Sequence, residues 1–132
     1  EVRTVDATAI AAPDRSFDLA VFALSFHHLP PEAAARVFAE GTRVADTLLI
    51  VDLPRPPSPV HLAKVLSLIA PALVWPFAHD GLISSMRAYS PSALRALAAH
   101  ADPAIEVEIT SGSGLGQFVV AARQTVVARR PR

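Results

Sequence analysis

The sequence predicts an α/β domain built around a buried, mostly parallel β-sheet. Two short apolar runs, 19–24 and 48–51, lack helical spacing and are typical of strands that are covered on both faces. Longer segments of helical character, 31–44 and 60–75, alternate with these runs, as they do in α/β folds. The chain has 132 residues, 52% of them hydrophobic, which suffices for one modest core and also suits a piece of a larger domain.

Charge and cysteine content exclude several classes of function. The formal net charge is zero, so nothing indicates nucleic acid or an anionic membrane surface as a partner. The absence of cysteine excludes disulfide frameworks and thiolate metal sites. No signal peptide is visible, and segment 60–75 is too short to span a membrane and is interrupted by Lys64 and Pro71. We therefore expect a cytoplasmic protein, whose oligomeric state the sequence leaves open.

Strands and helices are expected to alternate in the first half of the chain. The expected elements are a strand at 2–5, a loop at 7–15, a strand at 17–24, a helix at 31–44 and a strand at 48–53. Pro31 suits the first position of its helix, and Glu32 suits the first turn, where the helix dipole favours an acid. Glu40 and Arg43 are three residues apart and should pair on the surface of this helix.

The second half is expected to close the sheet with an antiparallel pair of strands. The expected elements are a proline-rich loop at 54–59, a helix at 60–75 that Pro71 kinks or ends, a loop at 79–90, a helix at 91–100 capped by Ser90, and strands at 105–110 and 115–123. Glycines at 112–116 have the spacing of a cofactor loop, but a strand follows them, which favours a hairpin turn. Residues 1–123 are then the domain, with 54–90 as a lid, and 124–132 is a frayed basic tail.

Two adjacent histidines follow the strand at 17–24, where an open α/β sheet binds its ligands. His27 and His28 could ligate a metal, orient a substrate, accept its proton, or tie the loop by hydrogen bonds. Adjacent residues of an extended segment point in opposite directions, and no third ligand has a recognisable spacing, so a metal site is disfavoured. The choice between a substrate role and a structural role remains open. Asp52, near the end of the strand at 48–53, is a further acid at this edge.

Five motifs in unbroken order resemble the second half of a class I S-adenosylmethionine-dependent methyltransferase. They are Asp6-Ala7, Asp14 to Leu19, His27 to Pro30, Glu40 to Val44 and Leu49 to Asp52. The most similar members are small-molecule enzymes of the ubiquinone/menaquinone-biosynthesis type. The resemblance implies a Rossmann-like sheet truncated at the N-terminus, because the family's glycine-rich loop and its ribose-binding acid should lie before Glu1. The family's Pro-Gly-Gly turn is also replaced, by residues 45–47.

The same resemblance implies roles for residues in binding the cofactor, S-adenosylmethionine. Asp6 matches the residue that meets the adenine amino group, and the amide of Ala7 should face the ring. Ala23 and Leu24 match positions that touch the methionine part of the cofactor. His28 lies at the mouth of the family's active site, so we predict it as the catalytic base. The alternative, from the residues alone, is that Asp6 is a strand-end acid that caps a turn.

The methyl acceptor is expected to be a small molecule bound by the lid. We predict His27, Arg87 and Tyr89 as its ligands, since Arg87 can pair a carboxylate bidentately and Tyr89 offers a hydroxyl and a ring. The alternative is a surface loop with Arg87 solvated. The apolar segment 60–75 hints at an apolar acceptor. We therefore predict methyl transfer within a longer chain; the alternative is a non-catalytic remnant of the fold that acts as a binding module. A hydrolase is disfavoured because no Gly-x-Ser-x-Gly elbow is present.

Overall fold

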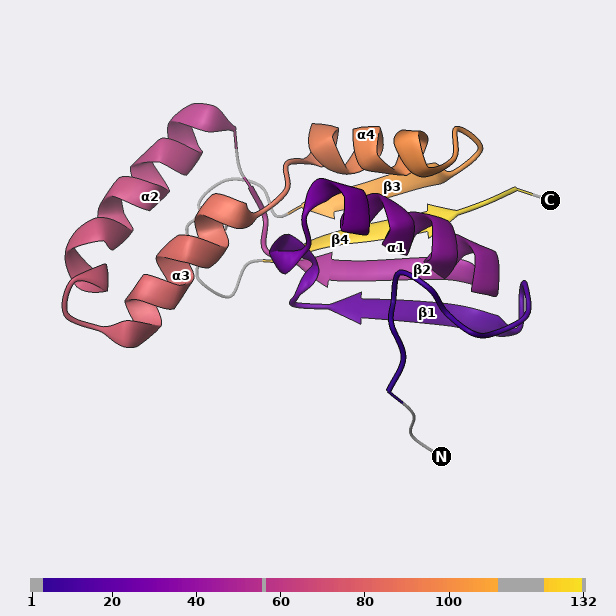
Figure 1. Cartoon of the computed structure of the whole chain (residues 1–132). Coiled ribbons are helices and arrows are strands. Elements are labelled where there is room, and N and C mark those ends of the chain that lie inside the picture. The colour runs from indigo at the N-terminus through magenta and orange to yellow at the C-terminus, as the bar shows by residue number, and fades with distance from the viewer. Residues whose placement is uncertain (1–3, 56, 112–122, 132) are drawn as a thin grey trace.

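The computed structural model describes residues 4–55, 57–111 and 123–131 and shows a four-stranded mixed sheet (Figure 1). The strand order is β1-β2-β4-β3. The strands are β1 (Phe17–Ala23), β2 (Ala45–Asp52), β3 (Glu106–Ser111) and β4 (Gln124–Arg129). β1 and β2 pair in parallel, and β4 runs antiparallel to both of its neighbours. The predicted α/β class, a mostly parallel Rossmann-like sheet with an antiparallel closing strand, is confirmed.

Four α-helices and one short 3₁₀-helix complete the described part of the chain. They are η1 (Phe26–His28), α1 (Pro31–Val44), α2 (Ser58–Ala72), α3 (Pro76–Arg87) and α4 (Pro91–Ala101). α1 has the predicted bounds, with Pro31 at its first position. The Ser90 hydroxyl accepts the Ala93 N–H at the start of α4, as predicted. α2 ends one residue after Pro71, which confirms that this proline terminates it.

The core lies between the sheet and the two helices α1 and α4, which cover the same face (Figure 1). Strand residues alternate between faces, and the alternation directs Leu48 and Ile50 of β2 toward these helices. The other fully buried members of this core are Phe26, Ala34, Phe38, Leu94, Ala98, Val126 and Ala128. The core therefore joins α1 and α4 to the two central strands.

The opposite face of β1 is not covered by any described element. Leu19 and Val21 are 51% and 57% exposed, and Phe17 is equally exposed. The prediction of a strand at this position is confirmed, but the prediction that it is buried on both faces is wrong. β1 is an edge strand, and α1 covers only its Ala20 and Phe22 side. Parallel strands normally have both faces covered, so this apolar surface lacks its usual packing partner within the described residues.

Three other predicted segments differ from the structure. Residues 124–129 are not frayed: they form β4, a central strand that pairs on both sides. Its Val126 and Ala128 are fully buried in the core shared with α1 and α4. The loop expected at 79–90 is largely helix α3, which Pro76 starts and in which Gly81 is tolerated at an open surface position. Residues 4–6 are not part of a strand. The strand predicted at 115–123 falls almost wholly outside the described residues, as does the turn at 112–116.

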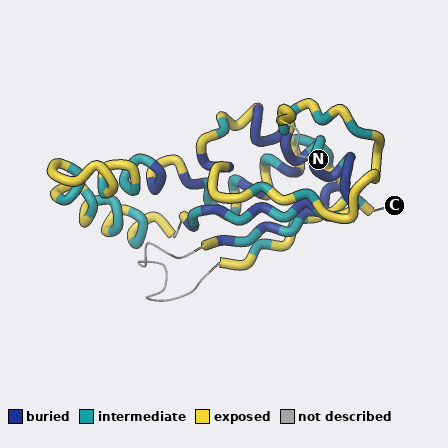
Figure 2. Tube along the Cα trace, turned by 90° about the horizontal axis from the view of Figure 1, so that it is seen from below, coloured by how far each residue is buried: buried dark blue, intermediate teal, exposed yellow. Residues whose placement is uncertain are grey.

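α2 and α3 form a helical hairpin beyond the carboxyl ends of β1 and β2, and they are the least buried part of the described chain (Figures 1 and 2). α2 has no buried residue, and α3 buries only Ser84 and Ser85. The hairpin occupies most of the segment 54–90 that the sequence predicted as a lid. It therefore stands next to the edge of the sheet where α/β folds bind ligands.

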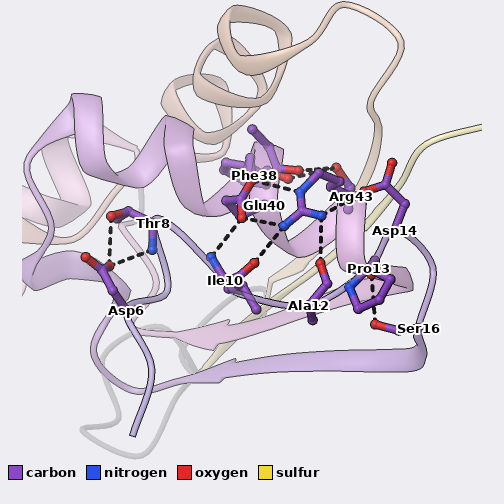
Figure 3. A network of polar contacts seen from close by, with 12 residues as sticks. Asp6, Thr8, Ile10, Ala12, Pro13, Asp14, Ser16, Phe38, Glu40 and Arg43 are labelled. Carbon is purple, nitrogen blue, oxygen red and sulfur yellow. Dashed lines mark hydrogen bonds and ion pairs between the residues drawn. The ribbon is translucent and has the colours of Figure 1, made fainter.

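The predicted pair of Glu40 and Arg43 is confirmed and belongs to a larger network (Figure 3). The Arg43 guanidinium contacts Glu40 at 2.8 and 2.9 Å and Asp14 at 2.7 Å. It also donates to the carbonyl oxygens of Ile10 and Ala12, and Glu40 accepts the Ile10 N–H. One guanidinium therefore ties the loop at 7–15 to α1, and this loop leads into β1.

Because of this network, the free energy of unfolding should fall as the pH is lowered into the acidic range. Hydrogen bonds from Arg43 hold the pKa of Glu40 below its ordinary value. A carboxyl with a lowered pKa in the folded state stabilises above its unfolded pKa, about 4.3 for Glu, and that contribution is lost as the pH falls through the folded value. We expect Arg43→Gln to lose less unfolding free energy than the parent between about pH 5 and pH 3. Urea titrations at several pH values measure this, with the exposed Arg95→Gln as the control; parallel curves for the parent and Arg43→Gln would contradict the assignment.

Candidate functional site

A short 3₁₀ turn places both histidines directly after β1, and an aromatic cluster holds that turn. Phe26 is 1% exposed, and its ring makes edge contacts with Phe22, Phe38 and Tyr89 at centroid distances of 5.5, 5.6 and 5.8 Å. His27 and His28 are therefore not on an extended segment, as the sequence suggested. Their rings are in contact, with centroids 4.2 Å apart and planes tilted by 39°.

His27 and Asp52 form a buried pair between the ends of β1 and β2. The His27 backbone N–H donates to Asp52 Oδ2, and the His27 Nδ1 lies 2.7 Å from Asp52 Oδ1. The two residues are 5% and 4% exposed. Both carboxylate oxygens are thus engaged by one residue, which fixes the plane of the imidazole. The other ring nitrogen, Nε2, is buried and has no hydrogen-bond partner among the described residues.

A pocket of about 380 Å³ lies beside this pair. Its polar walls come from η1, from the loop after β2 and from the α3–α4 junction. The polar lining residues are His27, His28, Arg55, Arg87, Tyr89 and Ser90, and the apolar ones are Leu29, Pro30, Ala88 and Ala93. Four residues that the sequence predicted for catalysis or substrate binding therefore line one pocket. Arg55 was missed, although a basic residue in the loop that follows the strand-end acid Asp52 could have suggested it.

Hydrogen bonds fix the far wall of the pocket. The Tyr89 hydroxyl donates to the Leu29 carbonyl at 2.8 Å, and burial raises the pKa of the Tyr89 phenol. The Gln124 side-chain amide donates to the Tyr89 and Leu53 carbonyls, so the newly found strand β4 supports the wall. Arg55 donates to the Ala88 carbonyl at 3.3 Å. Tyr89 therefore connects the end of η1 to the start of α4. Its role in binding a substrate remains a prediction.

The predicted cofactor residues lie outside this pocket, along the edge of β1 and the loop that precedes it. Leu24 has a φ of 56°, in the left-handed region, where a residue other than glycine is strained by about 1–2 kcal/mol. Its N–H is held by the Val51 carbonyl at 2.8 Å, and both Leu24 and Ala23 are exposed. Such strain is concentrated at ligand sites, and the small Ala23 side chain lets a ligand approach the backbone. The contact of Ala23 and Leu24 with a cofactor remains a prediction.

Asp6 has a local structural role in the described chain (Figure 3). Its Oδ1 accepts both the N–H and the hydroxyl of Thr8 at 2.8 Å, and these hydrogen bonds lower the pKa of the Asp6 carboxyl. This is the turn-capping arrangement that the sequence left as the alternative. Contact with an adenine remains a prediction for Asp6 and for Ala7, whose partly buried side chain packs on the core.

The part of the chain that the structure describes contains neither a candidate metal site nor a candidate membrane-spanning helix. No group of three or more His, Asp or Glu side chains there could hold a metal ion. Within the same ranges, no helix is both long enough and apolar enough to cross a bilayer.

Comparison with solved structures shows that the fold is that of methyltransferases. The chain superimposes on a SAM-dependent methyltransferase from Aquifex aeolicus with a TM-score of 0.59 and 19% identity, and on the [4+2]-cyclase SpnF with a TM-score of 0.60 and 15% identity. It covers 55% of each of those chains, while 99% and 98% of this chain is aligned. A Bacillus halodurans protein assigned to the methyltransferases gives a TM-score of 0.54 at 16% identity over 76% of its length and 97% of this chain. No family model and no curated protein matches the sequence.

Proposed function

We propose that this chain is the acceptor-binding part of an S-adenosylmethionine-dependent methyltransferase. The observation that carries the proposal is the pocket that joins His27, His28, Arg55 and Arg87 at the carboxyl edge of a methyltransferase-type sheet. Ligands of open α/β sheets bind at this edge. The likeness to methyltransferase structures supports the class of reaction, and the acceptor is inferred from the pocket alone.

The cofactor is proposed to lie along the end of β1. Ala23 and Leu24 would contact its methionine part, and Asp6 and Ala7 its adenine, as the family resemblance implies. Bound S-adenosylmethionine supplies a methyl group that is already activated by the sulfonium. The protein then contributes mainly alignment, which is the larger part of the rate for such a transfer. A base is needed only for an acceptor that is not yet ionised, and His28 is the base that the sequence suggested.

The acceptor is proposed to be a small molecule with an acidic group and an apolar body. Arg55 and Arg87 contribute to the lining of the pocket, and none of its described lining residues carries a carboxylate. Leu29, Pro30 and Ala93 supply apolar walls. An aromatic or quinone-like ring with a carboxylate fits this combination, which is consistent with the quinone-biosynthesis type that the sequence resembles.

We also propose that the functional protein includes a further segment, as the sequence suggested. The first two structures above are nearly twice as long as the region that this chain matches. The exposed apolar face of β1, formed by Phe17, Leu19 and Val21, is the surface that such a segment would cover.

Transfer of a labelled methyl group to a panel of hydroxylated aromatic acids tests the proposal. Acids should be methylated, and their matched amides should be poor acceptors. Arg87→Gln should raise the KM of the acids about 10-fold or more while changing kcat little, because the lost charge-assisted contact binds the ground state and the transition state alike. Arg95→Gln is the control on an exposed face of α4. Equal rates for acids and amides would contradict the anionic acceptor, and a protein that binds S-adenosylmethionine without transferring methyl to any of them would favour the binding-module alternative.

A further inference from the structure

We propose that His27, oriented by Asp52, is the group that takes the proton from an acceptor hydroxyl. The inference rests on the proposed methyl transfer and goes beyond it, because the sequence assigned this role to His28 and gave Asp52 none. The buried pair and its unpartnered nitrogen carry the argument.

The hydrogen bond to Asp52 decides which nitrogen of His27 can act. A carboxylate can only accept, so the 2.7 Å contact with Asp52 Oδ1 places the proton of a neutral imidazole on Nδ1. Nε2 then carries a lone pair and can accept a proton. The second contact, from the His27 backbone N–H to Asp52 Oδ2, holds the carboxylate in place. Asp52 is thus a positioning residue, and an imidazolium formed on His27 would be stabilised by its charge.

The free nitrogen points to a partner that the protein itself does not supply. Nε2 of His27 is buried and has no hydrogen-bond partner among the described residues, although His27 lines the pocket. Buried polar atoms are nearly always paired in folded proteins, and exceptions often mark a catalytic or ligand-binding role. A hydroxyl of the acceptor, donating to Nε2, would complete this site.

His28 is less suited to the same task. It is exposed, and no carboxylate contacts its ring in the part of the chain that the structure describes. Its ring lies against that of His27 in a tilted arrangement. The other titratable or charged groups around the pocket are Arg55, Arg87 and Tyr89.

The step balances without any further reactant. The acceptor oxygen forms a bond to the methyl carbon as the bond between that carbon and sulfur breaks. The hydroxyl proton moves from the acceptor oxygen to Nε2 of His27, and the imidazolium later gives it to water. The products are a methyl ether or ester, S-adenosylhomocysteine and one proton.

Kinetics of the complete protein give the first test. We expect His27→Gln to lower kcat about 10²–10⁴-fold with little change in cofactor affinity, since general-base assistance has this size. His28→Gln should lose less, and His100→Gln, an exposed histidine at the end of α4, is the matched control. Added imidazole should restore part of the rate to His27→Gly and none to His28→Gly. Parent-like kcat in His27→Gln, or rescue of His28→Gly alone, would overturn the assignment.

A measurement without turnover separates this inference from the proposed function. Nitrogen NMR of the imidazole rings should show the Nδ1-protonated form of His27 in the parent and loss of that preference in Asp52→Asn. A bound acceptor acid should shift the Nε2 resonance of His27 before any cofactor is added. An Nε2-protonated His27 in the parent would overturn the assignment even if methyl transfer is observed. A parent that binds no S-adenosylmethionine overturns the proposed function, and the assignment of the base with it.

Discussion

Replacing Phe26 with alanine should lower the free energy of unfolding by about 3–5 kcal/mol, the usual cost of removing a buried phenylalanine. The ring is 1% exposed and meets three other aromatic rings at edge geometry. The loss combines the transfer of the ring with a cavity that the packed core can close only in part. Since Phe26 begins η1, the same variant should also loosen the positions of His27 and His28.

Urea denaturation of the parent and of Phe26→Ala measures this change. The matched control is Phe77→Ala, the same chemical change at a side chain that is 80% exposed at the tip of the α2–α3 hairpin. That control should stay within about 0.5 kcal/mol of the parent. Similar losses in the two variants would show that the aromatic cluster does not hold the site.

The second large effect is expected from Asp52→Ala, at about 3 kcal/mol of unfolding free energy. Asp52 is 4% exposed and accepts two hydrogen bonds from His27, one from the backbone and one from the ring. Its removal leaves both donors buried without an acceptor, and hydrogen bonds to a charged group contribute about 1.5–3 kcal/mol each. The loss should fall mainly on the junction of β1 and β2.

The exposed Asp46→Ala is the control, because Asp46 meets Arg15 only at 3.4 Å on the surface and should contribute no more than about 1 kcal/mol. A double-mutant cycle with His27→Ala isolates the pair, and we expect a coupling energy of about 1–3 kcal/mol. Independent, additive effects of the two substitutions would contradict a structural link between His27 and Asp52.

The sequence predicted correctly those helix starts that are determined by residues adjacent in the chain. Pro31 and its first-turn acid predicted α1 to the residue, and Ser90 with Pro91 predicted the start of α4. The tail prediction at 124–132 failed because β4 pairs with β2, which lies far away in sequence, and because its side chains are buried against α1 and α4. The burial predicted for β1 failed because it depends on what covers the second face, and a run of apolar residues cannot show that.

The sequence predicted part of the residue set of the candidate pocket, but not the hydrogen bonds that connect it. His27, His28, Arg87 and Tyr89 were identified from the sequence and do line one pocket. The pair of His27 with Asp52 was not foreseen, because it depends on the parallel register that sets Ala23 opposite Val51 and brings the two strand ends together. The η1 turn also contradicts the extended geometry assumed for the two histidines.

Calorimetric titration of the complete protein with S-adenosylmethionine tests the central claim most directly. The account predicts one cofactor per chain, with binding weakened at least about 10-fold by Leu24→Arg, which brings a cation to the sulfonium, and left unchanged by Phe77→Ala. Residues 1–132 alone should bind much more weakly than the complete protein. No heat of binding in the complete protein, or equal affinity in Leu24→Arg, would contradict a cofactor site at the end of β1.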